Sequence, residues 1–217
     1  MVAGESLADL ELKVIERCVK SQGRLLDLGC GNGRAGLFFT INGFEVVGVD
    51  IDGSTLHEAR RVAKENGVDF ALVQADARRL CFRSESFDYV VSLASTLSEK
   101  HRVWLNGSDR RVSVDEATRV AGLNGTILVS FVHRYWSLRG LVSFLRHYLK
   151  WAMEKISGKR TELGDYVELI GGAPIRFHAF TIREATSLFS KKRCRLETWK
   201  RGAIFTDWFF IVAKKAI

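Results

Sequence analysis

The chain has 217 residues, of which 47% are hydrophobic and 27% are charged, values typical of an ordinary globular protein. Its single proline and its lack of serine-, proline- or glutamine-rich tracts exclude a disordered or linker-rich chain. No segment reaches the roughly 20 apolar residues that a membrane helix needs, and the first residues contain no apolar core of a secretory signal. The four cysteines form no C-x-x-C pair. We therefore expect a cytoplasmic protein with neither a disulfide framework nor a metal site.

Positive charge is concentrated in the second part of the chain. Residues 1–130 contain 16 Lys and Arg against 18 Asp and Glu, a net charge of −2, whereas residues 131–217 contain 17 against 7, a net charge of +10. Such asymmetry indicates an anionic partner, for which the candidates are RNA, a phosphorylated metabolite and an acidic membrane surface. The alternative is a basic face that contacts only solvent.

Hydrophobic periodicity and turn residues predict an alternation of helices and strands. The predicted helices cover residues 5–21, 36–40, 54–65, 115–121 and 181–189, and the predicted strands cover residues 24–28, 44–50, 70–73, 87–92, 125–132, 195–200 and 204–213. Ser54 is the predicted N-cap of the third helix, and Thr181 with Glu184 forms a capping box that opens the last helix. Strands separated by helices predict an α/β fold with five parallel strands. The last two strands are separated only by residues 201–203, so they form a hairpin and the final strand runs antiparallel.

The segment Leu25–Arg34, with the sequence LLDLGCGNGR, carries the strongest signal for a ligand site. A strand that leads into a glycine-rich turn and then a helix brings backbone amides close to a ligand. Two registers compete: G-x-G-x-x-G from Gly31, typical of dinucleotide sites, and G-x-G-x-G from Gly29. Because the strand ends at Leu28, the second register is favoured. A buried carboxylate at Asp27 also favours a cationic ligand over a pyrophosphate.

The segment Asp27–Gly33 resembles motif I of the class I S-adenosylmethionine-dependent methyltransferases, in particular the type 11 branch akin to the quinone-biosynthesis enzymes. The resemblance covers about residues 22–132 and agrees in pattern over residues 180–214. It implies a Rossmann-like sheet of seven strands in the order 3-2-1-4-5-7-6, with helices on both faces. It also implies that Asp27 lies by the methionine amino end of the cofactor. The loop along which the cofactor passes would then contain Gly29, Cys30, Gly31 and Gly33.

The resemblance extends to the ends of the following strands. Asp50, which ends the second strand in VVGVD, matches the acid that binds both ribose hydroxyls, and Ile51 follows it. Asp76 matches the acid that receives the adenine N6 amino group, with Ala77 beside it. Ser92 ends the fourth strand, whose end lies beneath the methyl group in this family. These matches imply one site at the carboxyl edge of the sheet, with S-adenosylmethionine as cofactor and S-adenosylhomocysteine as its product.

Two departures from related families narrow the chemistry. The fourth strand continues as Ser-Leu-Ala-Ser from Ser92, and not as the Asn/Asp-Pro-Pro-aromatic tetrad that positions exocyclic amines of bases. This disfavours adenine-N6 methylation. Cys30 belongs to the cofactor loop and Cys81 to a turn, so no cysteine takes the place of a nucleophile. Covalent cytosine-C5 chemistry is therefore disfavoured as well.

Residues 133–178 form an insertion too long for a plain crossover between the fifth strand and the last helix. Apolar residues at helical spacing from Leu138 to Ile156 predict a basic amphipathic helix, flanked by Tyr135 and Trp151. We expect the insertion either to pack on the sheet edge or to act as a lid that excludes water and selects the substrate. A membrane-surface role is weaker, because the protein itself needs the apolar face.

The sequence assigns no general base. Methyl transfer from a sulfonium needs a base only if the acceptor must lose a proton, and the candidates near the strand ends are His101, His133, Tyr135 and His178. We expect a single domain over residues 1–217 that methylates an anionic acceptor, with a small molecule favoured. A tRNA or other RNA methyltransferase is the first alternative, and a non-catalytic S-adenosylmethionine-binding protein is the second.

Overall fold

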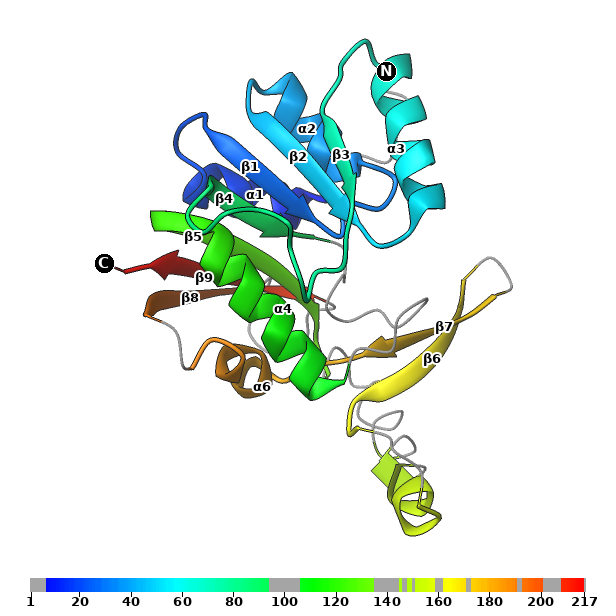
Figure 1. Ribbon diagram of the computed structural model, residues 1–217. Coiled ribbons are helices and arrows are strands. Elements are labelled where there is room, and N and C mark those ends of the chain that lie inside the picture. Colours follow the sequence, from blue (N-terminus) through cyan, green and yellow to red (C-terminus); the bar gives the residue numbers. More distant parts are fainter. Residues whose placement is uncertain are drawn as a thin grey trace.

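The computed structural model describes residues 7–93, 106–134, 145, 148–149, 151–158, 162–170, 173–190, 193–200 and 208–216. A seven-stranded sheet forms its centre (Figure 1). The strands of this sheet are β1 (Arg24–Leu28), β2 (Glu45–Asp50), β3 (Ala71–Gln74), β4 (Phe87–Ser92), β5 (Ala121–Val132), β8 (Cys194–Lys200) and β9 (Trp208–Lys215). The helices with assigned bounds are α1 (Asp9–Cys18), α2 (Arg34–Ile41), α3 (Gly53–Glu65), α4 (Gly107–Val120) and α6 (Ile182–Ser187).

The strand order is β3-β2-β1-β4-β5-β9-β8. The predicted order is thus confirmed, with β8 and β9 as the sixth and seventh strands of the prediction. Neighbouring strands from β3 to β5 pair in parallel, whereas β9 pairs antiparallel with both β5 and β8. Because the five parallel strands point the same way, their carboxyl ends share one edge of the sheet, the edge at which open α/β sheets bind ligands.

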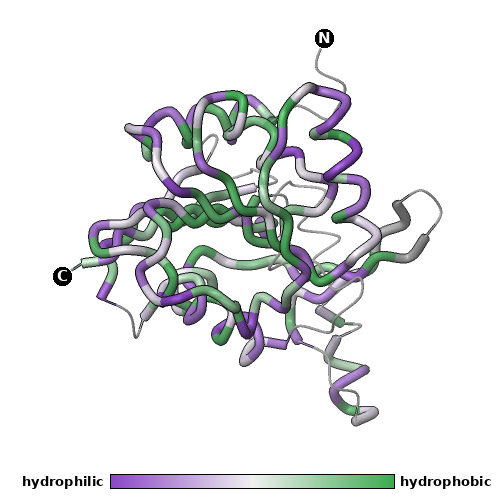
Figure 2. The backbone as a smooth tube through the Cα atoms, turned by 45° about the horizontal axis from the view of Figure 1, so that its top comes forward, coloured by the Kyte–Doolittle hydropathy of each residue, from purple (hydrophilic) through white to green (hydrophobic). Residues whose placement is uncertain are grey.

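Helices cover both faces of the sheet, because side chains alternate along each strand and both sets are apolar. Leu26 and Leu28 of β1 belong to the core cluster that includes residues of α4 and α6, whereas Leu25 belongs to the cluster that includes residues of α1, α2 and α3. All three leucines are at most 2% exposed, and burial of each contributes about 1.5–3 kcal/mol. Figure 2 shows the resulting hydrophobic centre, with the hydrophilic residues toward the outer helices.

The predicted N-cap of the third helix is wrong. Asp52, and not Ser54, is the N-cap of α3: its carboxylate accepts the Ser54 backbone N–H at 2.9 Å. Residues 115–120 are helical as predicted, whereas Ala121 begins β5, and the helix α4 that contains them begins at Gly107, where Asn106 caps it and Asp109 completes a capping box. The capping box of Thr181 and Glu184 at α6 is confirmed.

A second sheet, absent from the prediction, lies within the insertion. It is an antiparallel pair of β6 (Asp165–Ile170) and β7 (Ala173–His178), which extends away from the main sheet (Figure 1). A Gly-Gly pair at residues 171–172 between two apolar runs is a hairpin signal, so the sequence did contain the information. Before the hairpin, residues 145, 148–149 and 151–156 are helical, in agreement with the predicted amphipathic helix.

Candidate active site

The carboxyl edge of the parallel strands brings together the predicted acidic and hydroxyl residues. Asp27 is the penultimate residue of β1, and Ser92 is the last residue of the adjacent β4. Asp50 ends β2 on the other side of β1 and pairs in register with Gln74, the last residue of β3. Residues that are up to 65 positions apart in the chain therefore line one edge, as the resemblance implied.

The glycine loop between β1 and α2 needs glycine for conformational reasons. Gly29, Gly31 and Gly33 have φ angles of 73°, 51° and 84°, in the left-handed region that side chains disfavour. The loop is tied to β2, because the Gly29 and Cys30 N–H groups both donate to the Val49 carbonyl, at 2.7 and 2.9 Å. A Cβ atom added to Gly31 would meet nothing within 4 Å. The loop backbone at Gly31 is therefore open to the approach of a ligand.

Asp27 organises the helix that follows this loop. Its Oδ2 accepts the backbone N–H of Gly36 at 2.9 Å, which is the third N–H of α2. Gly33, the N-cap residue of α2, has no side chain to do so, and Asp27 therefore takes the place of a capping side chain. The carboxyl is only 2% exposed. Burial raises its pKa to about 7, against the opposing effects of the Gly36 hydrogen bond and the Arg34 charge.

A buried ion pair, which the sequence analysis missed, closes the loop from the α1 side. Glu11 of α1 accepts two hydrogen bonds from the Arg34 guanidinium, at 2.5 and 2.8 Å, and both side chains are largely buried. This bidentate geometry fixes the position of Arg34, whose charge favours the ionised form of Asp27. An acid in the first turn of α1 and a base after the glycines carried no sequence pattern that would pair them.

Asp50 is held with its carboxylate at the loop. Oδ2 accepts the N–H of Gly31 and Oδ1 accepts the N–H of Asp52, each at 2.9 Å. The carboxylate is half-buried, and each oxygen retains a lone pair for a further donor. The following Ile51 is 39% exposed at the same edge. The Asp50 carboxylate therefore holds the open Gly31 backbone in place and can still accept hydrogen bonds from the hydroxyl groups of a ligand.

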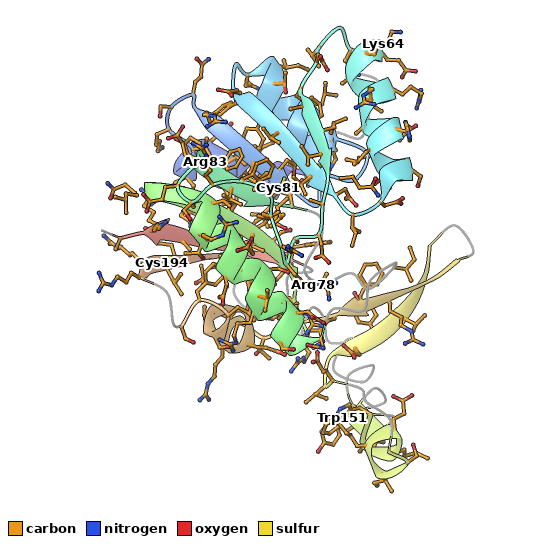
Figure 3. The ribbon with its side chains drawn as sticks, in the orientation of Figure 1. Lys64, Arg78, Cys81, Arg83, Trp151 and Cys194 are labelled. Atoms are coloured by element: carbon orange, nitrogen blue, oxygen red, sulfur yellow. The ribbon has the colours of Figure 1, made fainter. Side chains whose placement is uncertain are left out.

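Asp76 already has a strong partner. Its carboxylate receives the Arg78 guanidinium, with Nη2 to Oδ2 at 2.6 Å, and the Arg78 backbone N–H at 2.8 Å. Arg78, which is labelled beside α4 in Figure 3, also pairs with Asp109 of that helix, with Nη1 3.2 Å from Oδ1. The hydrogen bonds from Arg78 lower the pKa of Asp76 below its usual range. Ala77 packs against the core. A ligand amine at Asp76 would share the carboxylate with Arg78.

Ser92 and Cys30 differ in what their side chains do. The Ser92 hydroxyl is buried and, among the described residues, has no hydrogen-bond partner. A buried unpartnered hydroxyl at the carboxyl end of a central strand is the kind of group that a bound ligand satisfies. The Cys30 thiol instead lies against β2, where it would be 3.0 Å from a Cβ atom on Gly48. Burial raises the pKa of this thiol, so it is an unreactive packing residue.

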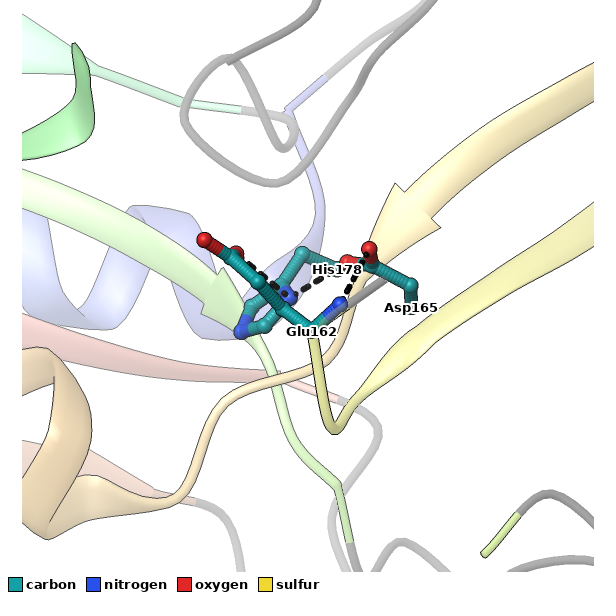
Figure 4. Close-up of side chains that lie close together, drawn as sticks. All are labelled: Glu162, Asp165 and His178. Atoms are coloured by element: carbon teal, nitrogen blue, oxygen red, sulfur yellow. Dashed lines mark hydrogen bonds and ion pairs between the residues drawn. The ribbon is translucent and has the colours of Figure 1, made fainter. Parts of the chain in front are cut away.

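A second polar cluster lies where β7 ends, and we call it the His178 cluster. It comprises Arg110, Arg134, Glu162, Asp165, His178 and Glu184. His178 is fully buried, with Nδ1 2.7 Å from Asp165 Oδ1 and Nε2 3.0 Å from Glu184 Oε1. Figure 4 shows Glu162 beside the same Nδ1. Both ring nitrogens of His178 therefore face carboxylate oxygens.

Two arginines pair with glutamates in the His178 cluster. Arg110 pairs with Glu162 at 2.6 Å, and Arg134 pairs with Glu184 at 2.5 Å. Burial would raise the pKa of both glutamates, but the hydrogen bonds and charges that face them, from Arg110 at Glu162 and from His178 and Arg134 at Glu184, outweigh it and hold each pKa below its usual range. The cluster fastens the insertion to the core, because it joins the start of β6 to α4, α6 and the end of β5.

Glu162, Asp165 and His178 also have a spacing that could suit a metal ion, since their ligand atoms lie within 4.8 Å of one another. However, the Arg110 guanidinium already binds Glu162, and His178 Nδ1 already forms a hydrogen bond with Asp165. A divalent ion would have to displace both contacts and would lie beside the Arg110 guanidinium. These three side chains are therefore better explained as an ion-pair and hydrogen-bond cluster than as a metal site.

The predicted base candidates divide into two groups. To act as a base, His178 would first have to leave one of its carboxylates, so the geometry favours an anchoring role. His133 is partly buried, and its ring contacts Phe209 edge-on at 5.5 Å. His101 and Tyr135 lie outside the described residues. No side chain among the described residues is thereby assigned as a general base.

Sequence comparison identifies the domain to which this edge belongs. Residues 25–124, from β1 into β5, match a protein family described as "Methyltransferase domain". YqeM of Bacillus subtilis (strain 168), a protein named as a methyltransferase, is 33% identical over 87 residues. That match covers 40% of this chain and 34% of YqeM, so it spans about a third of the relative's length.

Comparison with solved structures extends the similarity to nearly the whole chain. A Methanosarcina mazei S-adenosylmethionine-dependent methyltransferase superposes with a TM-score of 0.75 at 21% identity, covering 98% of this chain and all of that one. The PH0226 protein from Pyrococcus horikoshii OT3 superposes with a TM-score of 0.70 at 23% identity, covering 95% of this chain and 87% of that one. A third structure is the Burkholderia thailandensis 1,6-didemethyltoxoflavin-N1-methyltransferase, solved with 1,6-didemethyltoxoflavin and S-adenosylhomocysteine. It superposes with a TM-score of 0.61 at 14% identity, covering 94% of this chain and 76% of that one.

Fold and sequence match therefore define a class. Residues 25–124 match a methyltransferase domain, and the chain has the fold of the S-adenosylmethionine-dependent methyltransferases of known structure, in agreement with the resemblance found in Asp27–Gly33. The type 11 branch is consistent with these matches.

Proposed function

We propose that this protein transfers a methyl group from S-adenosylmethionine to an anionic acceptor, and that the acceptor is a small molecule. The observation that carries the proposal is the carboxyl edge of the sheet. There the open Gly31 backbone donates a hydrogen bond to Asp50, and the first turn of α2 donates one to Asp27. This arrangement offers backbone and carboxylate groups to a ligand with hydroxyl and ammonium groups.

The residues present fit the proposed cofactor. Asp50 would accept the ribose hydroxyls beside Ile51, Asp76 with Ala77 would receive the adenine amino group, and Asp27 would face the methionine amino end. The buried Ser92 hydroxyl, which has no partner among the described residues, supports a ligand at the end of β4. When bound, the cofactor supplies an activated sulfonium methyl group. The protein's own contribution is orientation and exclusion of water.

An anionic acceptor is supported by the net charge of +10 over residues 131–217. A small molecule is supported by the B. thailandensis structural neighbour, which is a 1,6-didemethyltoxoflavin-N1-methyltransferase with 1,6-didemethyltoxoflavin bound. RNA is the alternative, since the same charge would attract a polyanion. The lid role of residues 133–178 is part of this proposal, with the His178 cluster as the fixed base of the insertion.

Cofactor binding can be tested by calorimetry with S-adenosylhomocysteine, S-adenosylmethionine and NAD. We expect both sulfur ligands to bind and NAD not to bind. Asp50→Ala should weaken binding by about 2–3 kcal/mol, the scale of hydrogen bonds to a charged group. The matched control is Asp69→Ala, at an exposed acid just before the amino end of β3, away from the carboxyl edge of the sheet. Tight NAD binding, or an unchanged affinity in a folded Asp50 variant, would contradict the proposal.

The acceptor can be sought with radiolabelled cofactor, total RNA and a metabolite extract. If RNA is the acceptor, binding should fall with salt at a log–log slope of roughly −0.7 per contacted single-strand phosphate, whereas a phosphorylated metabolite should give a shallower slope. The double substitution Arg146→Ala and Lys150→Ala, at positions outside the described residues, should weaken binding of the acceptor and leave the affinity for the cofactor unchanged. Turnover insensitive to salt and to this double variant would refute an anionic acceptor. Cofactor binding without turnover of any acceptor would favour the non-catalytic alternative.

A further inference from the structure

The helix of the insertion exposes its apolar residues. Leu145 is 58% exposed, Leu149 56%, Met153 71% and Ile156 88%. The expectation that the protein itself needs this face is therefore wrong for these four side chains. In Figures 1 and 3 the helical segment that carries Trp151 extends away from the main sheet. Exposed apolar side chains in such a group, unlike scattered single ones, mark an interaction surface.

The four residues form one stripe. They follow one another at intervals of four, four and three positions, and a helix turns about 100° per residue, so they fall within an arc of roughly 80°. Tyr148 adds a ring that is 41% exposed and lies 5.6 Å from the ring of Trp151, which is partly buried. Tyr and Trp side chains have an apolar body and a polar tip, which suits a boundary between water and hydrocarbon.

The charge of this part of the chain selects the partner. Residues 131–160 contain seven Lys and Arg against one acid, Glu154. A second copy of the same segment would place like charges opposite one another, which disfavours self-association through this stripe. RNA would match the charge, but it would not bury side chains as exposed as Ile156 and Met153. An anionic lipid surface satisfies both the charge and the apolar stripe.

We propose that the stripe of Leu145, Leu149, Met153 and Ile156 docks this protein on the surface of an anionic lipid bilayer. The helix would lie in the interface, with the stripe toward the acyl chains and the basic residues at the phosphates. This agrees with the finding that none of the described helices is long and apolar enough to cross a bilayer. The proposal does not depend on the methyl acceptor or on cofactor binding.

The test is co-flotation of the full chain with vesicles of phosphatidylcholine that contain about one third phosphatidylglycerol. We expect the wild-type protein to float with these vesicles at low salt and to bind vesicles of pure phosphatidylcholine far less. Met153→Asn with Ile156→Asn should weaken the partition coefficient about tenfold or more. The matched control is Ile41→Asn with Leu123→Asn, two apolar side chains that are each 52% exposed elsewhere. This control should bind like the wild type.

A charge variant gives an independent readout. Lys155→Glu, at an exposed position of the same helix, should reduce partition into the anionic vesicles several-fold, and added salt should reduce wild-type binding. No flotation with anionic vesicles at low salt would overturn the proposal. Equal binding by the Met153 and Ile156 double variant would overturn it as well, because binding would then be electrostatic only. Loss of self-association in that variant, without vesicle binding by the wild type, would identify a second copy as the occupant and would also overturn it.

Discussion

Replacement of Asp27 by asparagine should change how stability depends on pH. Burial raises the pKa of Asp27 from 3.8 to about 7, so between these values the folded protein holds a proton that the unfolded chain has lost. The stabilisation from this proton is complete below the unfolded pKa and is lost as the pH rises toward 7. The asparagine of the Asp27→Asn variant would keep a carbonyl for the Gly36 N–H and would not titrate.

The magnitude follows from the same two values. The stability of the wild type relative to Asp27→Asn should fall at up to about 1.4 kcal/mol per pH unit, and by roughly 2 kcal/mol between pH 5 and pH 7. Above about pH 7.5 the difference should be constant, because Asp27 is then ionised in both states. Other titrating groups contribute equally to both proteins and cancel.

Urea unfolding at pH 5, 6, 7 and 8, followed by circular dichroism, measures this difference directly. Asp69→Asn, at an exposed carboxylate, serves as the control and should run parallel to the wild type throughout. If the wild-type and Asp27→Asn curves are also parallel from pH 5 to pH 8, Asp27 does not carry a raised pKa. The reasoning from its burial would then be refuted.

The His178 cluster yields two further predictions. Arg110→Ala should lower the free energy of unfolding in urea by about 3–5 kcal/mol, because Arg110 is 2% exposed and its loss leaves Glu162 without its guanidinium partner. The control Arg60→Ala, at an exposed position, should be nearly neutral. Equal effects of the two substitutions would show that the cluster does not anchor the insertion. Glu184→Gln should make the stability of the fold less sensitive to acid. The pKa of Glu184 is lower in the folded protein than in the unfolded chain, so its ionised form stabilises the fold at a pH above the unfolded-state pKa. This stabilisation is lost as the pH falls through the folded-state pKa. Identical acid unfolding of Glu184→Gln and wild type would contradict that sign, which is opposite to the sign at Asp27.

Much of the fold was predictable because its signals are local. Buried apolar runs predicted the strands, and the strand order followed from the resemblance carried by the glycine loop. The same loop located the candidate site, since Asp27, Asp50 and Ser92 each end or nearly end a parallel strand. The β6–β7 hairpin also had a local signal in its Gly-Gly pair, and it was missed because the insertion was interpreted only as a helix.

Tertiary structure alone decided how the site residues are used. The hydrogen bond from the Gly36 N–H to Asp27, the Glu11–Arg34 pair and the Arg78–Asp109 pair all depend on the packing of separate elements. No spacing rule joins such residues, because their distance in space is set by the sheet and not by the chain.

Tertiary structure also decided the His178 cluster and the exposure of the apolar helical face of the insertion. The His178 cluster gathers residues from positions 110 to 184, and only their convergence shows that both ring nitrogens face carboxylates. Periodicity over residues 138–156 determined that the insertion has an apolar helical face. Whether that face is buried depends on what packs against it, and Ile156, at 88% exposure, shows that this part of the face is not covered by the described chain. Amphipathicity is a property of the sequence, whereas burial is a property of the assembled fold.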